Sequence, residues 1–228
     1  MKTTLRIALL CLASLVLPCA HAQQSEALRK QFLEDKAKAE QGDAEAQSNL
    51  GRSYATGEGV KQDFAEAVKW FRKAAEQGHA KAQLNLGVCY YYGRGVTKDL
   101  AKAVKWYRKA AEQNYAGAQY NLGFCYYNGQ GVEKDYAEAV KWYRKAAEQN
   151  NAGAQFSLGG CYYNGQGVEK DYAEAYAWFN LASKTDKEAA EVRDGLEKKM
   201  SPQQVADAQK RTKELRAQIE AKLESGGK

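Results

Sequence analysis

The sequence predicts an all-α protein, a solenoid of helix-turn-helix repeats with capping helices at its ends. Three observations lead to this prediction. The chain aligns with itself at an interval of 36 residues, and a constant period of about 20 to 50 residues is typical of solenoids. Ala, Glu, Lys, Gln and Tyr are abundant, a composition that points to an all-helical protein. The two prolines lie outside the repeated region.

The first segment resembles a secretory signal peptide. Lys2 and Arg6 precede an apolar stretch, and small residues flank His21 at the cleavage position. We expect residues 1–22 to be removed after Ala22, leaving a mature protein that begins at Gln23 and is periplasmic or secreted. No stretch reaches the roughly 20 apolar residues of a membrane-spanning helix.

Lipidation is an alternative fate for this segment. Cys19 follows an apolar run, as a lipidated cysteine does, but Pro18 stands where that motif has Gly or Ala. Cleavage after Ala22 leaves 32 basic and 28 acidic residues, a net charge of +4. This mild excess shows no clustered basic face, so we expect no nucleic-acid partner.

The register of the self-alignment divides the chain. Residues 23–42 match the second helix of a repeat and form an N-terminal capping half-repeat. Four full repeats and the terminal elements follow: repeats 43–78, 79–114, 115–150 and 151–186, capping helices 187–224, and a disordered tail 225–228. The tryptophans, Trp70, Trp106, Trp142 and Trp178, fall in register.

Each repeat has the boundary chemistry of two helices. In the first repeat we expect helices at 43–56 and 63–77, because Gly57 can adopt the left-handed conformation that ends a helix and Asp63 can cap the next one. Glu66 completes a capping box with Asp63. The box recurs as Asp135/Glu138 and Asp171/Glu174, whereas the second repeat has Lys102 in place of the glutamate.

Gly51 recurs in mid-helix as Gly87, Gly123 and Gly159. Glycine costs about 1 kcal/mol relative to Ala there, so its recurrence predicts a close approach of two helix backbones. In the last predicted helix, a stripe would cover the open face of the fourth repeat: Val205, Ala208, Thr212, Leu215, Ile219 and Leu223.

The recurring strings A-E-A-Q-x-x-L-G-x-x-Y, G-x-G-V-x-x-D and A-V-K-W-F-x-x-A-A closely resemble the Sel1-like repeat, a relative of the tetratricopeptide repeat. The resemblance covers all four repeats. It implies a right-handed superhelix that binds protein partners on its concave surface. Some cysteine-rich relatives are associated with β-lactam binding or hydrolysis, but they carry two cysteines per repeat and this chain has at most one.

In such a superhelix the first helices line the concave surface. Their positions opposite the packing face vary between repeats and are rich in aromatic residues. The predicted partner-binding residues are Leu84, Val88, Tyr91, Tyr120, Phe124, Tyr127, Phe156 and Tyr163. The alternative is that this apolar face is solenoid core.

Cysteines and basic residues also recur. Cys89, Cys125 and Cys161 are interpreted as core packing, with a redox or intermolecular disulfide and a metal ladder as alternatives. The second helices carry a basic ladder: Lys69, Arg72, Lys73, Lys105, Arg108, Lys109, Lys141, Arg144 and Lys145. With Glu76, Glu112 and Glu148 within a turn, a solvated convex face is favoured over an anion site.

No pattern predicts catalysis, a cofactor or a metal. His79 is interpreted as a solvated loop histidine because one imidazole cannot form a zinc site alone. The acyl-serine spacing Ser-x-x-Lys occurs once, from Ser225 to Lys228, in a glycine-rich terminus. The sequence therefore predicts a non-enzymatic exported scaffold for a protein or peptide partner. The alternatives are an envelope protein that recognises cell-wall fragments and a β-lactamase-like hydrolase.

Overall fold

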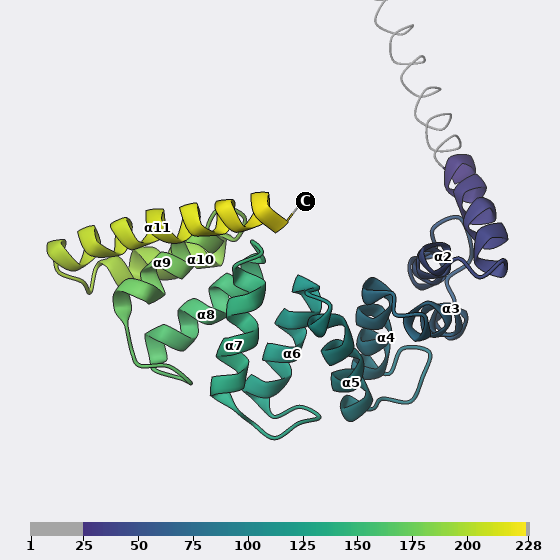
Figure 1. The fold of residues 1–228 in the computed structure, drawn as a ribbon, viewed down its shortest axis with the longest axis horizontal. Helices are drawn as coiled ribbons and strands as arrows, with labels where there is room; N and C mark the ends of the chain where they lie inside the picture. Colours follow the sequence, from purple (N-terminus) through teal and green to yellow (C-terminus); the bar gives the residue numbers. More distant parts are fainter. Residues whose placement is uncertain (1–24, 227–228) are drawn as a thin grey trace, which may run out of the picture. The chain divides into compact units, whose positions relative to one another are not determined.

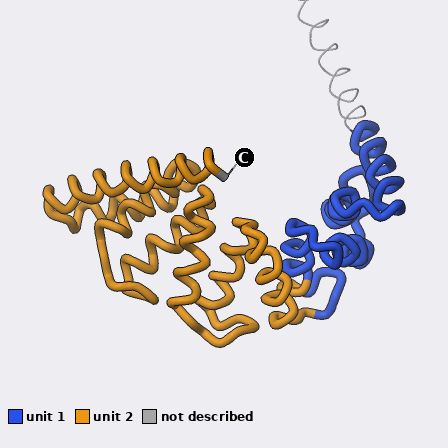
Figure 2. Tube along the Cα trace, in the orientation of Figure 1, with its two compact units in different colours: residues 1–89, 93–97 blue, residues 90–92, 98–228 orange. Residues whose placement is uncertain are grey.

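The computed structural model describes residues 25–226, and the predicted signal peptide lies outside them. The described chain is helical and without strands, which confirms the predicted all-α fold. The chain divides into two compact units, residues 1–89 with 93–97 and residues 90–92 with 98–228 (Figure 2). Among the helices of residues 25–226, none is long and apolar enough to cross a membrane.

Within each unit, successive helices run antiparallel to one another (Figure 1). The first unit contains a helical segment at residues 25–40, α2 (Ala44–Thr56), α3 (Phe64–Glu76) and most of α4 (Ala80–Tyr92), whose last three residues belong to the second unit. The second unit contains α5 (Leu100–Glu112), α6 (Ala116–Asn128), α7 (Tyr136–Ala147), α8 (Ala152–Asn164), α9 (Tyr172–Ala182), α10 (Lys187–Glu197) and α11 (Pro202–Gly226). α11 thus includes Ser225 and Gly226, which the sequence assigned to the tail.

The second helices begin at the predicted aspartates, but the predicted capping box does not form. The Asp63 carboxylate accepts hydrogen bonds from the Ala65 and Glu66 amides, as expected of an N-cap. Its own amide, which Glu66 would bind in a capping box, instead donates to the Tyr54 carbonyl at 2.8 Å. Glu66 pairs with Lys69. The Asp63 amide therefore links the two helices of one repeat, and the Glu66 carboxylate is free to form an ion pair with a lysine.

Glycine serves two purposes in the turns. Gly57 ends α2 in the left-handed conformation, with a φ of 81°. In the third repeat the equivalent helix-ending glycine is Gly129. Two residues after it, Gly131, at a φ of +73°, lies so close to α5 that a Cβ atom would stand 2.3 Å from the Leu100 carbonyl oxygen. No side chain fits at that distance, so this glycine allows the turn of one repeat to pack on the second helix of the preceding one.

The mid-helix glycines accommodate an aromatic ring, and at Gly123 the predicted close approach to the partner helix backbone also occurs, because a Cβ atom there would lie 3.1 Å from the Ala139 carbonyl oxygen. A Cβ atom at Gly51 would lie 2.6 Å from Cδ1 of Phe71, and one at Gly123 would lie 2.8 Å from Cδ1 of Tyr143. Phe71 and Tyr143 are both buried. The ring of the second helix therefore packs where the first helix has no side chain.

Buried glutamines join consecutive repeats. Gln119 and Gln155 donate through Nε2 to the carbonyls of Ala111 and Ala147, at 3.2 Å and 3.1 Å, and so satisfy acceptors at the end of the preceding second helix. Gln149 in turn donates to Oε1 of Gln119 at 2.7 Å. The sequence analysis did not predict this role, although glutamine recurs at this position every 36 residues.

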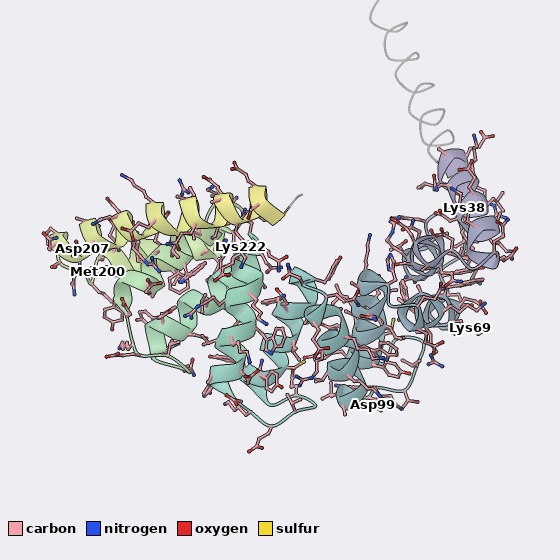
Figure 3. All side chains as sticks on the ribbon, viewed as in Figure 1. Lys38, Lys69, Asp99, Met200, Asp207 and Lys222 are labelled. Atoms are coloured by element: carbon pink, nitrogen blue, oxygen red, sulfur yellow. The ribbon has the colours of Figure 1, made fainter. Side chains whose placement is uncertain are left out.

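α11 covers the last repeat, as predicted. Ala208, Thr212, Leu215 and Ile219 are buried, and the latter two share a cluster with Trp178 and Leu181 of α9. Arg211 forms an ion pair with Glu174. In Figure 3 Lys222 lies near the end of α11, and its Nζ donates to Glu148 at 2.5 Å. Leu223 departs from the predicted stripe because it is 43% exposed.

Candidate protein-binding surface

One stripe of each first helix stays accessible to solvent. On α6 it runs through Gly117, Asn121, Phe124 and Asn128, whose spacing of three and four residues places them on one helical face. Phe124 is 38% exposed. On α8 the residue at the same repeat position is Gly160, where a Cβ atom would meet nothing within 4 Å. The accessible stripe of α6 therefore carries an exposed aromatic ring, whereas the stripe of α8 has no side chain at the equivalent position.

Tyr120, predicted to contact a partner, is half-buried. Its ring lies 5.9 Å from that of Tyr143, centroid to centroid. A Cβ atom at Gly153 of α8 would be 3.3 Å from Cζ of Tyr120, so the ring fills the space between two first helices. Part of its surface is therefore solenoid core, and the rest is exposed to solvent.

Tyr91 and Tyr127 connect repeats. Their hydroxyls donate to Oε1 of Gln130 and Gln166, in the turn of the following repeat, each at 2.6 Å. Burial raises the pKa of both phenols above the ordinary value, so both remain protonated donors at neutral pH. These two predicted contact residues are engaged in holding the repeats together.

Phe156 and Tyr163 pack near the C-terminal cap. The Phe156 ring lies 5.4 Å from that of Phe179, and the Tyr163 ring lies 5.5 Å from that of Tyr172. Lys199 donates to the Tyr163 hydroxyl at 3.1 Å, and this hydrogen bond lowers the pKa of the phenol. Both residues are half-buried.

Leu84 and Val88 belong to α4 and to the first unit, and both are half-buried. Of the eight predicted residues, Phe124 is thus the one with an exposed side chain, and the other seven are half-buried.

The sequence analysis missed Asn121. It is half-buried on the exposed stripe, and within residues 25–226 its carboxamide makes no hydrogen bond. Asparagine is unfavourable in helix interiors because its side chain competes for backbone hydrogen bonds. The recurrence of Asn49, Asn85 and Asn121 at 36-residue intervals was the signal that could have identified it. Tyr92, 61% exposed at the last position of the α4 stripe, was also missed.

The cysteines are free and buried, consistent with their interpretation as core packing. Burial raises the pKa of the Cys89 and Cys161 thiols to about 11 and that of Cys125 to about 12. The thiolate is the reactive form. Thiol chemistry at neutral pH is therefore suppressed at all three positions.

The basic ladder is exposed, apart from the half-buried Arg108, and its pairing differs from the prediction. Lys69 and Lys141 pair with Glu66 and Glu138, one turn upstream. Glu148, predicted to neutralise the ladder, pairs with Lys222 of α11.

His79 caps α4. Its Nδ1 accepts a hydrogen bond from the Ala82 amide at 3.3 Å, in the position that Asp43 and Asn151 occupy in other repeats. His79 lies in the connection before α4, as predicted, but it is half-buried and its imidazole satisfies an amide at the helix N-terminus, a role that was not predicted. Ser225 donates to the Lys222 carbonyl on α11.

Comparison with known proteins identifies four repeats in this chain. The Sel1 repeat model matches residues 44–79, 80–115, 116–151 and 152–184. A Sel1 repeat protein from Oxalobacter formigenes is 40% identical with a TM-score of 0.68, over 72% of this chain and 66% of that one. The protective antigen c5321 of uropathogenic Escherichia coli, which displays an SLR fold, is 34% identical with a TM-score of 0.55, over 82% of this chain and 48% of that one.

A third solved structure, a putative Sel1 repeat protein from Klebsiella pneumoniae, is 21% identical with a TM-score of 0.50 and shares the fold. The alignment covers 77% of this chain and 96% of that one. This chain spans 66% of the Oxalobacter protein and about half of c5321. The comparison with curated proteins gives no match.

Proposed function

Because the chain belongs to the Sel1 repeat family, whose members are generally non-enzymatic scaffolds for protein–protein interaction, we propose that it is an exported adaptor that binds a partner protein through its first helices. The observation that carries this proposal is the α6 stripe. It combines an exposed ring, Phe124, with a carboxamide, Asn121, that has no partner within the described residues.

The two side chains supply complementary interactions. Phe124 offers apolar area at a low entropic cost, as aromatic hot spots do. Asn121 presents both a donor and an acceptor, the pair that one peptide unit of a partner backbone can satisfy. Their separation of three residues places them on adjacent turns of one face. A partner segment lying on α6 would contact both.

The surrounding residues keep this surface rigid. Tyr127 is held by its hydrogen bond to Gln166, and Tyr120 by packing against Tyr143 and Gly153. A rigid surface loses little side-chain entropy on binding, which favours affinity. Tyr120 and Tyr127 thus contribute by supporting the stripe.

A comparative capture experiment tests the proposal. The mature protein, Phe124→Ala, Asn121→Ala and the control Val192→Ala are immobilised and exposed to periplasmic extract. Val192 is a matched control because it is 37% exposed on α10, away from the first helices. We expect a protein that the wild type and the control retain and that both α6 variants lose. Identical sets of captured proteins on all four would contradict the proposal.

A further inference from the structure

A cleft of about 400 Å³ lies beside α7 on the second-helix side of the repeat. Three cations, Lys141, Arg144 and Lys145, line it together with Glu148, and Val140 and Val168 provide apolar wall. Val168 belongs to the turn between α8 and α9, so two consecutive repeats form the cleft. The proposed function on the first helices makes no use of this site.

The charges in the cleft do not balance. Lys141 pairs with Glu138 at 2.9 Å, and the single carboxylate of the lining, Glu148, pairs with Lys222 from α11. Within the described part of the chain, Arg144 and Lys145 form no ion pair with a carboxylate. Two positive charges therefore face the cleft without a counter-charge from residues 25–226.

Both cations are held in place by aromatic groups. Arg144 donates through Nη2 to the Tyr162 hydroxyl at 2.5 Å, and Nζ of Lys145 lies 4.2 Å from the centre of a Trp142 ring. Cation–π and neutral hydrogen-bond partners position a charge without cancelling it. The two groups are therefore oriented in advance for an anionic ligand.

The same arrangement occurs one repeat earlier on α5. Arg108 donates to the Tyr126 hydroxyl at 2.6 Å, and Lys109 lies 4.5 Å from the centre of a Trp106 ring. Lys102 stands where the other repeats have glutamate, and it pairs with Asp99. Lys141 pairs with Glu138, one turn upstream, whereas Lys105 has Lys102 at the equivalent position and therefore lacks such a glutamate. α5 is thus the most basic of the three second helices that carry the ladder.

We propose that the cation-bearing sides of α5 and α7, with the cleft beside α7, are a second binding surface, which takes an acidic peptide segment with interspersed apolar side chains. Carboxylates would pair with Arg108, Lys109, Arg144 and Lys145, and the planar guanidinium groups of the two arginines offer bidentate geometry. The valine wall favours a peptide over a bare polyanion, because an apolar side chain between two carboxylates would be buried there. The surface is independent of the α6 stripe.

Fluorescence anisotropy of the full mature chain tests this surface. The probe is a fluorescein-labelled peptide of alternating glutamate and leucine residues. We expect the double variant Lys109→Glu/Lys145→Glu to weaken binding by about 10-fold or more, because reversing interfacial charges replaces attraction by repulsion. The control Lys210→Glu/Lys213→Glu changes net charge equally on exposed positions of α11 and should change affinity by about 2-fold or less.

Three further measurements complete the test. Phe124→Ala should bind the probe as the wild type does, and loss of binding would place the peptide on the first helices and overturn the proposal. Equal weakening in both double variants, absence of binding at low salt, or tighter binding of a polyphosphate probe than of the peptide would also overturn it. If the double variant fails to fold by circular dichroism, Lys109→Gln alone, which leaves the Lys145–Trp142 contact intact, should still weaken binding measurably.

Discussion

Gly123 and Gly160 lie on the first helices α6 and α8, and an added methyl group would meet different surroundings at each. At Gly123 it would stand 2.8 Å from the buried Tyr143 ring and 3.1 Å from the Ala139 carbonyl oxygen. At Gly160 it would meet nothing within 4 Å. The same residue type thus accommodates a ring at one position and leaves an open surface at the other.

This contrast predicts opposite effects of one substitution. Gly123→Ala should destabilise the protein by about 1–3 kcal/mol, because overpacking outweighs the gain in helix propensity. Gly160→Ala should stabilise it by about 0.5–1 kcal/mol, because only the propensity term acts. Urea unfolding of both variants measures the difference. Stabilisation of equal size at both positions would show that Gly123 is not required by packing.

The buried thiols give a second prediction at this scale. Because their pKa values lie near 11 to 12 and the side chains are buried, Cys89, Cys125 and Cys161 should resist a maleimide in the native protein at pH 8. All three should react in denaturant. Peptide mapping by mass spectrometry reports each site separately, and rapid labelling of Cys125 in the native state would refute this assignment.

Single residues also show what the sequence could reveal. The caps at Asp63 and Gly57 were predictable because they depend on neighbours within a few positions. The partner of the Asp63 amide, the ring at Gly51 and the hydrogen bond from Tyr127 to Gln166 were not, because each depends on how two helices or two repeats pack. Asn121 was missed because an asparagine on a helix carries no local pattern beyond its recurrence.

At the scale of elements, α11 shows how a repeat array is terminated. It places a buried stripe against α9 and ion pairs at Glu174 and Glu148, while its outer face is polar. Terminal repeats need such a polar outer surface for solubility. The helix and most of its buried stripe were predictable from periodicity. The exposure of Leu223 was not, because periodicity does not show where the neighbouring helix ends.

The cap can be tested with two leucines of the same helix. Leu215 is 5% exposed and Leu223 is 43% exposed. Leu215→Ala should lower the free energy of unfolding by about 2–5 kcal/mol through the cavity it leaves, whereas Leu223→Ala should change it by about 0.5 kcal/mol or less. Thermal unfolding with both variants distinguishes these outcomes. A Leu215→Ala protein as stable as the wild type would mean that α11 is not part of the core.

Over the whole molecule, a set of residues that cap and pack the helices recurs in each repeat, whereas the residues on the accessible stripe of the first helices differ. Capping aspartates, buried glutamines and turn glycines recur at 36-residue intervals. The stripe changes from Arg52 in the first repeat to Val88, Phe124 and Gly160 in the following ones. Such variation on a constant frame is expected of a scaffold in which packing fixes the interior and a partner determines the accessible face.

Export is the prediction at this scale that concerns the first segment. In a bacterial host, the chain should be recovered from the periplasm or medium with Gln23 as its first residue, because the segment before it has the charge, apolar run and small residues that signal peptidase requires. N-terminal sequencing of the recovered protein checks this. A lipid-modified N-terminus at Cys19, or an uncleaved product in the cytoplasm, would contradict it.

The most direct test of the protein-binding surface combines stability and affinity on one variant. For Phe124→Ala we predict a loss of about 1 kcal/mol or less in the free energy of unfolding, because the side chain is partly exposed. Its affinity for the partner captured by the wild type should fall by about 2 kcal/mol or more. A loss of about 3–5 kcal/mol in stability would instead identify Phe124 as core and contradict the account, as would unchanged partner affinity in a fully folded variant.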